Sequence, residues 1–213
     1  MKLKYKAVFF DLDGTLFDTS EGIYNTFDYL FVKYGKNVER DIYPSFIGPP
    51  VRTSLARFFE SGVVDGVHDE FRQYYGSVGK FQAKLYDGIP DALAFFKASG
   101  CRIYTATSKS EIMSVEITRK FGINGYFDRV YGADASVGRV EKEDVLQYAL
   151  TDSGEDPKEC LLIGDTIFDV RGAEHSGIAC LAVTYGFGKK EEMTGNCVIG
   201  YAASPREVID MFG

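Results

Sequence analysis

Histidine and cysteine are scarce in this sequence, which contains two histidines and four cysteines among 213 residues. A histidine-rich zinc site or a relay built on imidazole is therefore poorly supported, since His68 and His175 lie in polar, surface-like surroundings. No two cysteines form a C-x-x-C pair, and each falls within or beside an apolar run, which predicts buried reduced thiols. The cysteines are Cys101, Cys160, Cys180 and Cys197. We expect the chemistry of this protein to depend on carboxylates.

Long basic runs and long apolar runs are also missing. The net charge is -7, from 24 Lys and Arg against 31 Asp and Glu, and no basic run exceeds a pair of lysines. This argues against a nucleic acid polymer or an acidic membrane as a partner. The apolar runs are too short to span a bilayer, and the N-terminal MKLKYKAVFFDLDG becomes acidic too early for a signal peptide. We expect a cytoplasmic protein without a membrane partner, as a monomer or a homodimer.

Short apolar runs rich in β-branched residues alternate along the chain with amphipathic helical patterns. Continuous apolar strands are typical of a parallel sheet that helices cover on both faces, so the pattern predicts an α/β fold with a doubly wound, Rossmann-like sheet. Pro90 and Gly100 mark the start and end of one helix, and Ser110 and Gly122 mark those of another. The predicted strands are Ala7–Phe10, Arg102–Ala106, Arg129–Tyr131, Leu161–Ile163 and Ile178–Thr184.

Residues 17–84 interrupt this alternation, because they contain helical patterns and no strong strand signal. The helical patterns cover Glu21–Tyr34, Val51–Ser61 and Val67–Val78. An insert directly after the first strand would lie at the carboxyl edge of the sheet, where α/β folds bind ligands. We therefore expect a helical cap domain at residues 17–84, inserted into a catalytic core formed by residues 1–16 and 85–213.

The first predicted strand runs directly into Asp11 and Asp13, which Gly14 follows, in the stretch AVFFDLDGTLFDT. Residues i and i+2 of a strand project to the same side, so both carboxylates could reach one point if the strand continued that far. Carboxylates that close repel each other, and their burial requires a proton or a cation. Gly14 permits a sharp exit from the strand. A solvated Asp-Gly turn is the plainer alternative, whereas Thr15 and Leu16 break the spacing of a calcium loop.

Complementary groups follow other predicted strands. Thr107, Ser108 and Lys109 end the second main strand, where hydroxyls and free helix N–H groups would meet phosphate oxygens. A plain helix cap explains the hydroxyls equally well. Lys142 opens a helix, where a cation opposes the favourable charge at a helix N-terminus. That placement hints at a role other than a solvated surface residue.

Asp165 stands at the tip of the fourth strand, and Asp169 follows about one helical turn later, so both side chains can face the same point. Either one alone is also a plausible helix cap. Together with Asp11 and Asp13 they predict a cluster of up to four carboxylates with few histidines, which suits Mg²⁺. The nearby hydroxyl and ammonium donors indicate a phosphoryl group as the ligand, and hence a small phosphorylated metabolite as the partner.

These residues, in this order, resemble the haloacid dehalogenase superfamily of phosphotransferases. Asp11–Leu16 matches the D-x-D-G-T-L motif, Thr107 the strand-end hydroxyl, Lys142 the lysine, and Gly164–Asp169 the G-D-x-x-x-D motif. The resemblance covers essentially the whole chain, including a helical cap between the first two motifs. The segments IGPPVRTSL and FRQYYGSVG are similar to cap segments of the phosphoglycolate phosphatase-like branch.

The resemblance implies an Mg²⁺-dependent phosphatase of small phosphomonoesters. Asp11 would attack phosphorus and form an aspartyl-phosphate, and Asp13 would protonate the leaving oxygen and then deprotonate the hydrolytic water. The ligands of Mg²⁺ would be the Asp11 side chain, the Asp13 backbone carbonyl and Asp165, with Asp169 binding through water or supporting the others. The residues that would hold the phosphoryl oxygens are Gly14, Thr107, Ser108 and Lys142.

Three assignments stay open. The family's lysine often precedes a proline, whereas a glutamate follows Lys142, so Lys109 or Arg139 could take part of its role. Arg52 resembles an arginine that reaches the substrate from related caps, and a solvated helix position explains it equally well. Asp18 could cap the N-terminus of the first helix of the cap domain, or it could brace the point where the cap domain leaves the core.

Several activities within the family are disfavoured. Dehalogenation needs no acid at Asp13, sugar phosphomutases would place a histidine where this chain has Ile23, and the motif around a phosphonatase's cap lysine is missing. Phosphoglycolate is the first expected substrate. The alternatives are a nucleoside 5′-monophosphate, as for a 5′-nucleotidase, and a sugar phosphate. Four aromatic residues could stack a base, although such residues in helical caps are more often core: Tyr24, Tyr43, Phe46 and Phe58.

Two hypotheses come from other classes of protein. A receiver-like phospho-switch also combines acids, a hydroxyl and a lysine, but it would place its phospho-accepting aspartate on the third strand and would lack the helical insert. An inactive family member that acts as a binding module is the other, although no catalytic position of the family is replaced in this chain.

Overall fold

The computed structural model describes residues 3–47 and 51–213, and the chain divides into two compact units. The core unit comprises Leu85–Gly213 together with the N-terminal segment up to Asp18, and the helical unit comprises Thr19–Lys84. The chain leaves the core unit through β2 (Phe17–Asp18) and returns through β3 (Lys84–Leu85). Within the described ranges, no helix has both the length and the apolar character that a membrane span requires.

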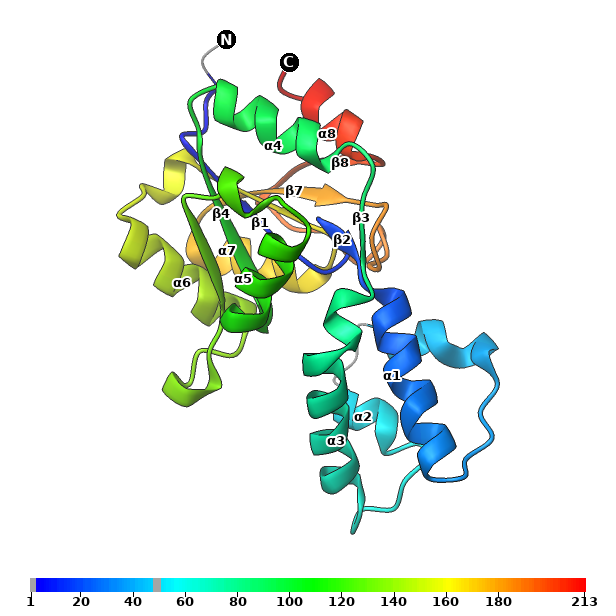
Figure 1. Cartoon of the computed structure of the whole chain (residues 1–213). Helices are drawn as coiled ribbons and strands as arrows, with labels where there is room; N and C mark the ends of the chain where they lie inside the picture. Colours follow the sequence, from blue (N-terminus) through cyan, green and yellow to red (C-terminus); the bar gives the residue numbers. More distant parts are fainter. Residues whose placement is uncertain (1–2, 48–50) are drawn as a thin grey trace. The chain divides into compact units, whose positions relative to one another are not determined.

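A six-stranded sheet organises the core unit, with the strand order β5-β4-β1-β6-β7-β8. Figure 1 labels β1, β4, β7 and β8 of this sheet. Neighbouring strands pair in parallel, and β1 lies between β4 and β6, so that Phe10 is level with Thr105 and Ile163. The strands are β1 (Ala7–Phe10), β4 (Arg102–Ser110), β5 (Arg129–Ala133), β6 (Cys160–Gly164), β7 (Ala179–Val183) and β8 (Val198–Ala202). The predicted α/β class with a parallel sheet is confirmed.

The sequence pattern predicts five of these six strands and misses β8. This strand alternates partly buried with exposed residues, and only Ala202 at its end is fully buried. An edge strand of this kind lacks the continuous apolar run by which buried parallel strands are found. The pattern also ends the second main strand at Ala106, whereas β4 continues to Ser110.

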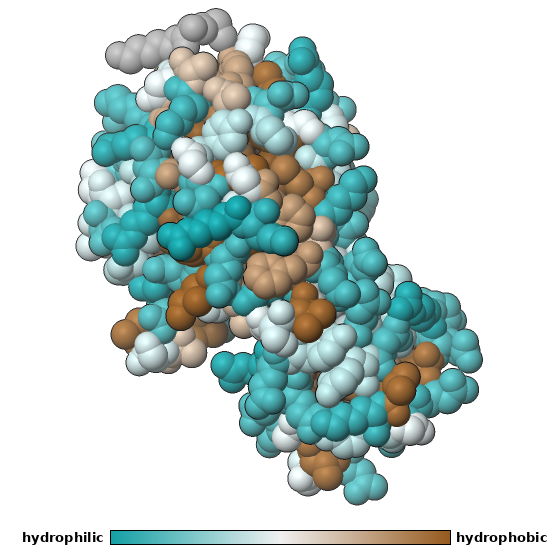
Figure 2. Space-filling view, in the orientation of Figure 1, coloured by the Kyte–Doolittle hydropathy of each residue, from teal (hydrophilic) through white to brown (hydrophobic). Residues whose placement is uncertain are grey.

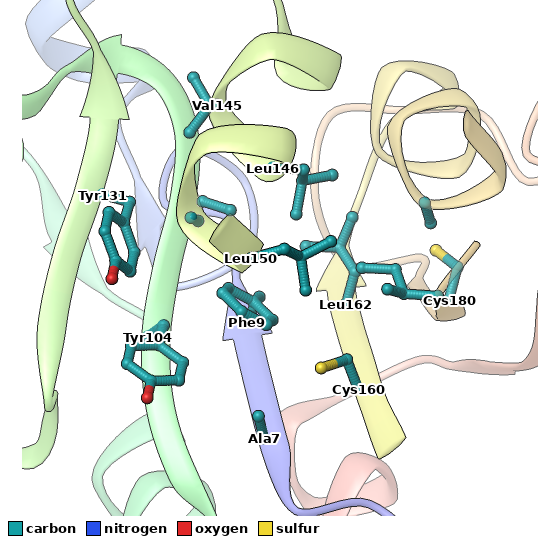
Figure 3. Close-up of a cluster of buried hydrophobic side chains, with 14 of the residues drawn as sticks. Ala7, Phe9, Tyr104, Tyr131, Val145, Leu146, Leu150, Cys160, Leu162 and Cys180 are labelled. Carbon is teal, nitrogen blue, oxygen red and sulfur yellow. The ribbon is translucent and has the colours of Figure 1, made fainter. Parts of the chain in front are cut away.

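Helices cover both faces of the sheet. On one face, α6 (Lys142–Ser153) and α7 (Ile167–Ser176) enclose an apolar cluster, in which Leu150 lies near Phe9 and Leu162 (Figure 3). Phe10 follows Phe9 in β1 and therefore points to the opposite face. There its ring meets that of Phe96 in α4 (Ile89–Ala98), with 5.9 Å between the ring centroids. The remaining helical elements of this unit are α5 (Glu111–Lys120), η3 (Asn124–Tyr126), η4 (Ala135–Val137), η5 (Pro157–Glu159) and α8 (Pro205–Asp210).

Turn residues locate the helix ends of the core unit closely, with one correction. Pro90 lies in the first turn of α4, and Gly100 follows this helix with a φ of +82°. Gly122 follows α5 with a φ of +75°. Ser110 occupies the N-cap position of α5, but its side chain makes no capping hydrogen bond. The predicted boundary is therefore confirmed, and the predicted side-chain cap is wrong.

The helical unit consists of short helices around an aromatic core. Phe27 of α1 (Ser20–Lys33) lies 4.4 Å from Phe46 and 5.1 Å from Phe71, measured between ring centroids. Tyr43 and Phe46 are fully buried in this core, which supports the plainer interpretation of those two aromatic residues. The elements are α1 (Ser20–Lys33), η1 (Arg40–Phe46), α2 (Val51–Leu55), α3 (Val64–Ser77) and η2 (Gly79–Phe81).

Helix α2 ends at Leu55, six residues earlier than the pattern predicts. The backbone N–H groups of Arg57 and Phe58 donate to carbonyls three residues back, at 3.3 and 2.9 Å, so the helix tightens into turns. The Gly-Pro-Pro sequence at 48–50, part of the cap-like segment IGPPVRTSL, lies outside the described residues.

The four cysteines are free thiols, as predicted, although Cys197 is only partly buried.

Hydrophilic side chains dominate the face seen in the space-filling view, and apolar side chains gather there in patches (Figure 2).

Candidate active site

Asp11 follows directly after β1, at the carboxyl edge of the sheet. Its backbone N–H donates to the carbonyl of Ile163 at 2.9 Å, which fixes the main chain beyond the end of the strand. The residue is only 7% exposed, so its carboxylate lies in a largely water-free position. β1 ends at Phe10, so the strand does not continue to Asp13, and strand alternation does not bring the carboxylates of Asp11 and Asp13 to one point.

Lys142 is the first residue of α6, and its side chain turns into the protein. Its Nζ lies 2.6 Å from Asp11 Oδ1 and 2.7 Å from Asp169 Oδ1, and it also donates to the carbonyl of Ala106 at 2.9 Å. A Cβ on Gly172 would lie 2.7 Å from Lys142 Cγ, so a glycine there leaves room for the lysine stem. The unusual cation at this helix N-terminus is thus explained by the two carboxylates that it meets.

Two further acids come from β6 and α7. Asp165 follows β6, and it accepts hydrogen bonds from Thr15 Oγ1 at 3.1 Å and from the N–H of Phe187 at 2.8 Å. Asp169 accepts at Oδ2 from the backbone and hydroxyl of Thr166, at 2.9 and 2.8 Å, as half of a capping box. Asp169 therefore combines helix capping with a position in the site, whereas the N-cap itself is Thr166 and not Asp165.

The carboxylates of Asp11, Asp165 and Asp169 form a buried cluster, in which one oxygen from each lies within 4.8 Å of the others. Burial raises the pKa of Asp11 to about 6, although the charge of Lys142 opposes the shift. Burial, together with the charges of Asp169 and Asp11, raises the pKa of Asp165 well above its usual range. Three acids against one ammonium group leave an excess of negative charge, which a divalent cation with oxygen ligands would balance.

Thr107, Ser108 and Lys109 lie where the pairing of β4 with β5 is irregular. Thr107 is level with Gly132, but the next paired residue of β4 is Ser110, so Ser108 and Lys109 form a bulge. The backbone N–H of Lys109 donates to Thr107 Oγ1 at 3.2 Å. Lys109 Nζ lies 2.9 Å from Asp13 Oδ2. The side chain of Asp13 is therefore engaged by Lys109, and the clustered carboxylates are three rather than four.

The remaining candidates have other partners or other places in the fold. Arg139 donates to the carbonyl of Gly132 and to Glu111 Oε2, both at 3.0 Å. Arg52 lies on α2 in the helical unit, where its Nε donates to Asp65 Oδ1 at 2.6 Å. The N-cap of α1 is Thr19, so Asp18, which belongs to β2, does not cap that helix.

The sequence model of the family described as Haloacid dehalogenase-like hydrolase matches residues 8–183 of this chain. The chain belongs to this family. It is thus a hydrolase, and the resemblance carried by its four motifs is confirmed.

Relatives and solved structures show the same affiliation over nearly the whole chain. A 5′-nucleotidase from Pseudomonas aeruginosa is 33% identical over 206 residues, which cover 94% of this chain and 92% of the relative. Tyrosine-protein kinase PtkA from Mycobacterium tuberculosis is 33% identical over 211 residues, or 98% of this chain and 72% of the relative. A phosphoglycolate phosphatase from Thiobacillus denitrificans is 27% identical over 202 residues, or 90% and 88%. The solved structure of a haloacid dehalogenase-like hydrolase from Streptococcus pneumoniae matches with a TM-score of 0.90 and 33% identity, covering 99% of both chains.

Sequence reasoning missed the residues of this haloacid dehalogenase-like hydrolase that hold Asp165 in place. Besides Thr15 and Phe187, two glycines pack tightly around it. A Cβ on Gly186 would lie 2.4 Å from Asp165 Oδ2, and one on Gly188 would lie 1.9 Å from the Asp165 carbonyl oxygen. The Gly-x-Gly pattern that follows a predicted strand was an available signal, but a pattern of two glycines is common in loops.

A Gly14→Ala substitution is expected to disturb this site strongly. Gly14 has a φ of +82°, and a Cβ there would lie 2.1 Å from Asp165 Oδ2. We expect a loss of about 3 kcal/mol or more in the free energy of unfolding, from backbone strain and from the clash together. Urea unfolding measures this loss, and calorimetric titration with Mg²⁺ should show weaker binding because Asp165 is displaced.

Gly138→Ala is the matched control for the part of the loss that comes from backbone strain. Gly138 has a φ of +73°, and a Cβ there would have no neighbouring atom within 4 Å. We expect this variant to lose about 1–2 kcal/mol in the free energy of unfolding and to bind Mg²⁺ unchanged. Equal effects of the two substitutions would contradict the close packing of Gly14 against Asp165.

Proposed function

We propose that this protein is an Mg²⁺-dependent phosphatase that hydrolyses small phosphomonoesters through an aspartyl-phosphate on Asp11. The observation that carries the proposal is the surroundings of Asp11, whose carboxylate lies against the Lys142 ammonium at 2.6 Å and within 4.8 Å of two further acids. A buried nucleophile next to a fixed cation and a candidate metal site is the arrangement that transfer of a dianionic phosphoryl group requires.

In the first half-reaction, a carboxylate oxygen of Asp11 forms a bond to phosphorus while the bond from phosphorus to the ester oxygen breaks. The carboxyl group of Asp13 gives its proton to the departing alkoxide, so that the alcohol leaves neutral. In the second half-reaction, the Asp13 carboxylate takes a proton from water, the water oxygen bonds to phosphorus, and the Asp11 carboxylate is released with inorganic phosphate. The groups that we propose as partners of the phosphoryl oxygens are Gly14, Thr107, Ser108 and Lys142.

The residues present fit a magnesium ion. Asp11, Asp165 and Asp169 supply oxygen ligands of the kind that Mg²⁺ prefers, and their excess negative charge supplies a reason for binding. We propose Asp11 and Asp165 as ligands together with the Asp13 backbone carbonyl, while Asp169 binds through water or supports the others. When bound, Mg²⁺ would neutralise charge on the phosphoryl oxygens. Lys142 stays charged at neutral pH, because the carboxylates of Asp11 and Asp169 outweigh the effect of burial and raise its pKa.

We further propose that residues 17–84 act as a cap domain that selects the substrate, with Arg52 as a candidate substrate contact. The helical unit has its own aromatic core, so it is suited to carry such a role as a separately folded element. Phosphoglycolate remains the first candidate substrate, which the 27% identity to a phosphoglycolate phosphatase supports. Nucleoside 5′-monophosphates are the second candidate, which the 33% identity to a 5′-nucleotidase supports.

The test is phosphate release by the purified protein, first freed of metal with EDTA and then supplied with Mg²⁺. The panel contains p-nitrophenyl phosphate, phosphoglycolate, nucleoside 5′-monophosphates and sugar phosphates. We expect turnover that requires Mg²⁺ and a clear preference for one class of ester. Absence of turnover on every ester would contradict the enzyme proposal and favour a binding module. Transfer from ATP to a tyrosine-containing peptide, without release of free phosphate, would favour the activity named for the mycobacterial relative.

A further inference from the structure

We propose that Lys109 is the positioning residue of the general acid and base Asp13, and this proposal rests on the phosphatase function proposed above. Lys109 Nζ lies 2.9 Å from Asp13 Oδ2, and the lysine side chain is only 7% exposed. The other oxygen of the same carboxylate, Oδ1, is buried and has no hydrogen-bond partner among residues 3–47 and 51–213. One oxygen is therefore held, and the other is left for the proton that moves to the leaving group.

The division between the two oxygens matters because proton transfer depends on direction. A carboxyl group that rotates freely presents either oxygen, whereas a group held at one oxygen presents the other in a fixed direction. Lys109 supplies such a hold through a charge-assisted contact of ordinary length. Asp13 is partly exposed, with 31% of its side chain accessible, so burial alone does not fix its orientation.

The backbone of β4 explains how this lysine reaches Asp13. The bulge between Thr107 and Ser110 adds two residues to the strand, and a bulge next to a site commonly redirects a side chain. The backbone N–H of Lys109 donates to Thr107 Oγ1 at 3.2 Å. The hydroxyl that we propose as a phosphate ligand therefore also stabilises the backbone of the bulge. Gly132 on the neighbouring strand is part of the same arrangement, since a Cβ there would lie 2.6 Å from the carbonyl oxygen of Lys109.

The two lysines of the site therefore have different partners. Lys142 lies against Asp11 and Asp169, where it faces the nucleophile. Lys109 lies against Asp13, where it faces the group that moves the proton. The first is proposed to stabilise the phosphoryl group, and the second to act on the leaving group through Asp13.

The experiment compares two esters that differ in their need for an acid. An alkyl ester such as glycerol 2-phosphate releases a strongly basic alkoxide, whereas p-nitrophenyl phosphate releases a weakly basic phenolate. The quantity compared is kcat/KM, because it covers the steps up to departure of the leaving group. We expect Lys109→Met to lower kcat/KM for the alkyl ester about 10- to 100-fold, and for the aryl ester less than about 5-fold.

Three further variants make the result specific. Asp13→Asn should show the same selectivity with a larger loss for the alkyl ester, and the double variant should lose no more than Asp13→Asn, because Lys109 acts through Asp13. Lys97→Met removes a lysine whose side chain is 46% exposed, and it should change neither ester's kcat/KM. Circular dichroism and thermal unfolding verify that Lys109→Met is folded.

Equal losses on both esters, with additive effects in the double variant, would overturn the proposal and indicate that Lys109 holds the phosphoryl group directly. An unchanged kcat/KM on both esters would overturn it as well. These outcomes differ from failure of the proposed function, in which the unmodified protein would turn over neither ester.

Discussion

Asp11→Asn is expected to abolish phosphate release, with kcat at least about 10⁴-fold lower than that of the unmodified protein. An amide oxygen is a poor nucleophile toward phosphorus, and the amide also removes one of the three charges that the candidate metal site provides. Steady-state turnover of p-nitrophenyl phosphate with Mg²⁺ measures the loss. Acid quenching with a radiolabelled substrate should trap a phosphorylated protein only when Asp11 is intact.

Asp210→Asn is a suitable control for this experiment. Asp210 lies in α8 and forms a surface ion pair with Arg206 at 3.0 Å, an interaction that contributes little to stability. We expect full activity from this variant. Turnover by Asp11→Asn close to the unmodified rate would contradict the nucleophilic role, and phosphoprotein formed by that variant would place the nucleophile elsewhere.

Lys142→Met is expected to lower kcat about 10³-fold and also to destabilise the metal-free protein. The activity is lost because the phosphoryl group loses a fixed cation that is already oriented. The stability is lost because Asp11 and Asp169 lose the buried cation that they share, and removal of one member of a buried ion pair typically costs about 3–5 kcal/mol. Urea unfolding in EDTA measures the second effect.

Magnesium provides the internal control for Lys142→Met. A dication bound to the three carboxylates should replace part of the missing positive charge, so saturating Mg²⁺ should restore much of the stability and little of the activity. Lys142→Arg should also be a poor enzyme, because the site is closely packed around the lysine stem, where a Cβ on Gly172 would lie 2.7 Å from Cγ. Stability that is the same in EDTA and in Mg²⁺ would contradict a metal site at these acids.

The residues that the motifs single out are those that tertiary structure gathers, with exceptions that have physical reasons. Asp11, Asp165, Asp169 and Lys142 meet as the motif pattern implies, because the ends of neighbouring parallel strands lie at one edge of the sheet. Asp13 does not join them, since β1 ends before it and Lys109 engages its side chain. The sequence pattern predicts the end of β1 at Phe10 correctly, but it could not show that Lys109 would engage Asp13.

Other features depend on contacts between residues far apart in the sequence. Thr15 and Phe187 hold Asp165 from distances of 150 and 22 residues along the chain. Thr15 belongs to the D-x-D-G-T-L motif, but neither it nor Phe187 is marked by a local pattern as a partner of Asp165. The bulge of β4 depends on its register with β5, so the direction of Lys109 could not be predicted from its neighbours in the sequence. Strand β8 went unrecognised because its residues at the edge of the sheet are only partly buried.

The sequence by itself determined the class of fold, the family and the set of acids, because apolar periodicity and short motifs are local properties that burial and chemistry impose directly on the chain. Only the tertiary structure decided which oxygen meets which ammonium group. Lys142 is 131 residues from Asp11 in the chain and 2.6 Å from it in space, and Lys109 turns to Asp13 through a bulge. Such pairings depend on strand register and helix packing across the whole core unit, and these arise from many contacts between distant residues rather than from any single segment.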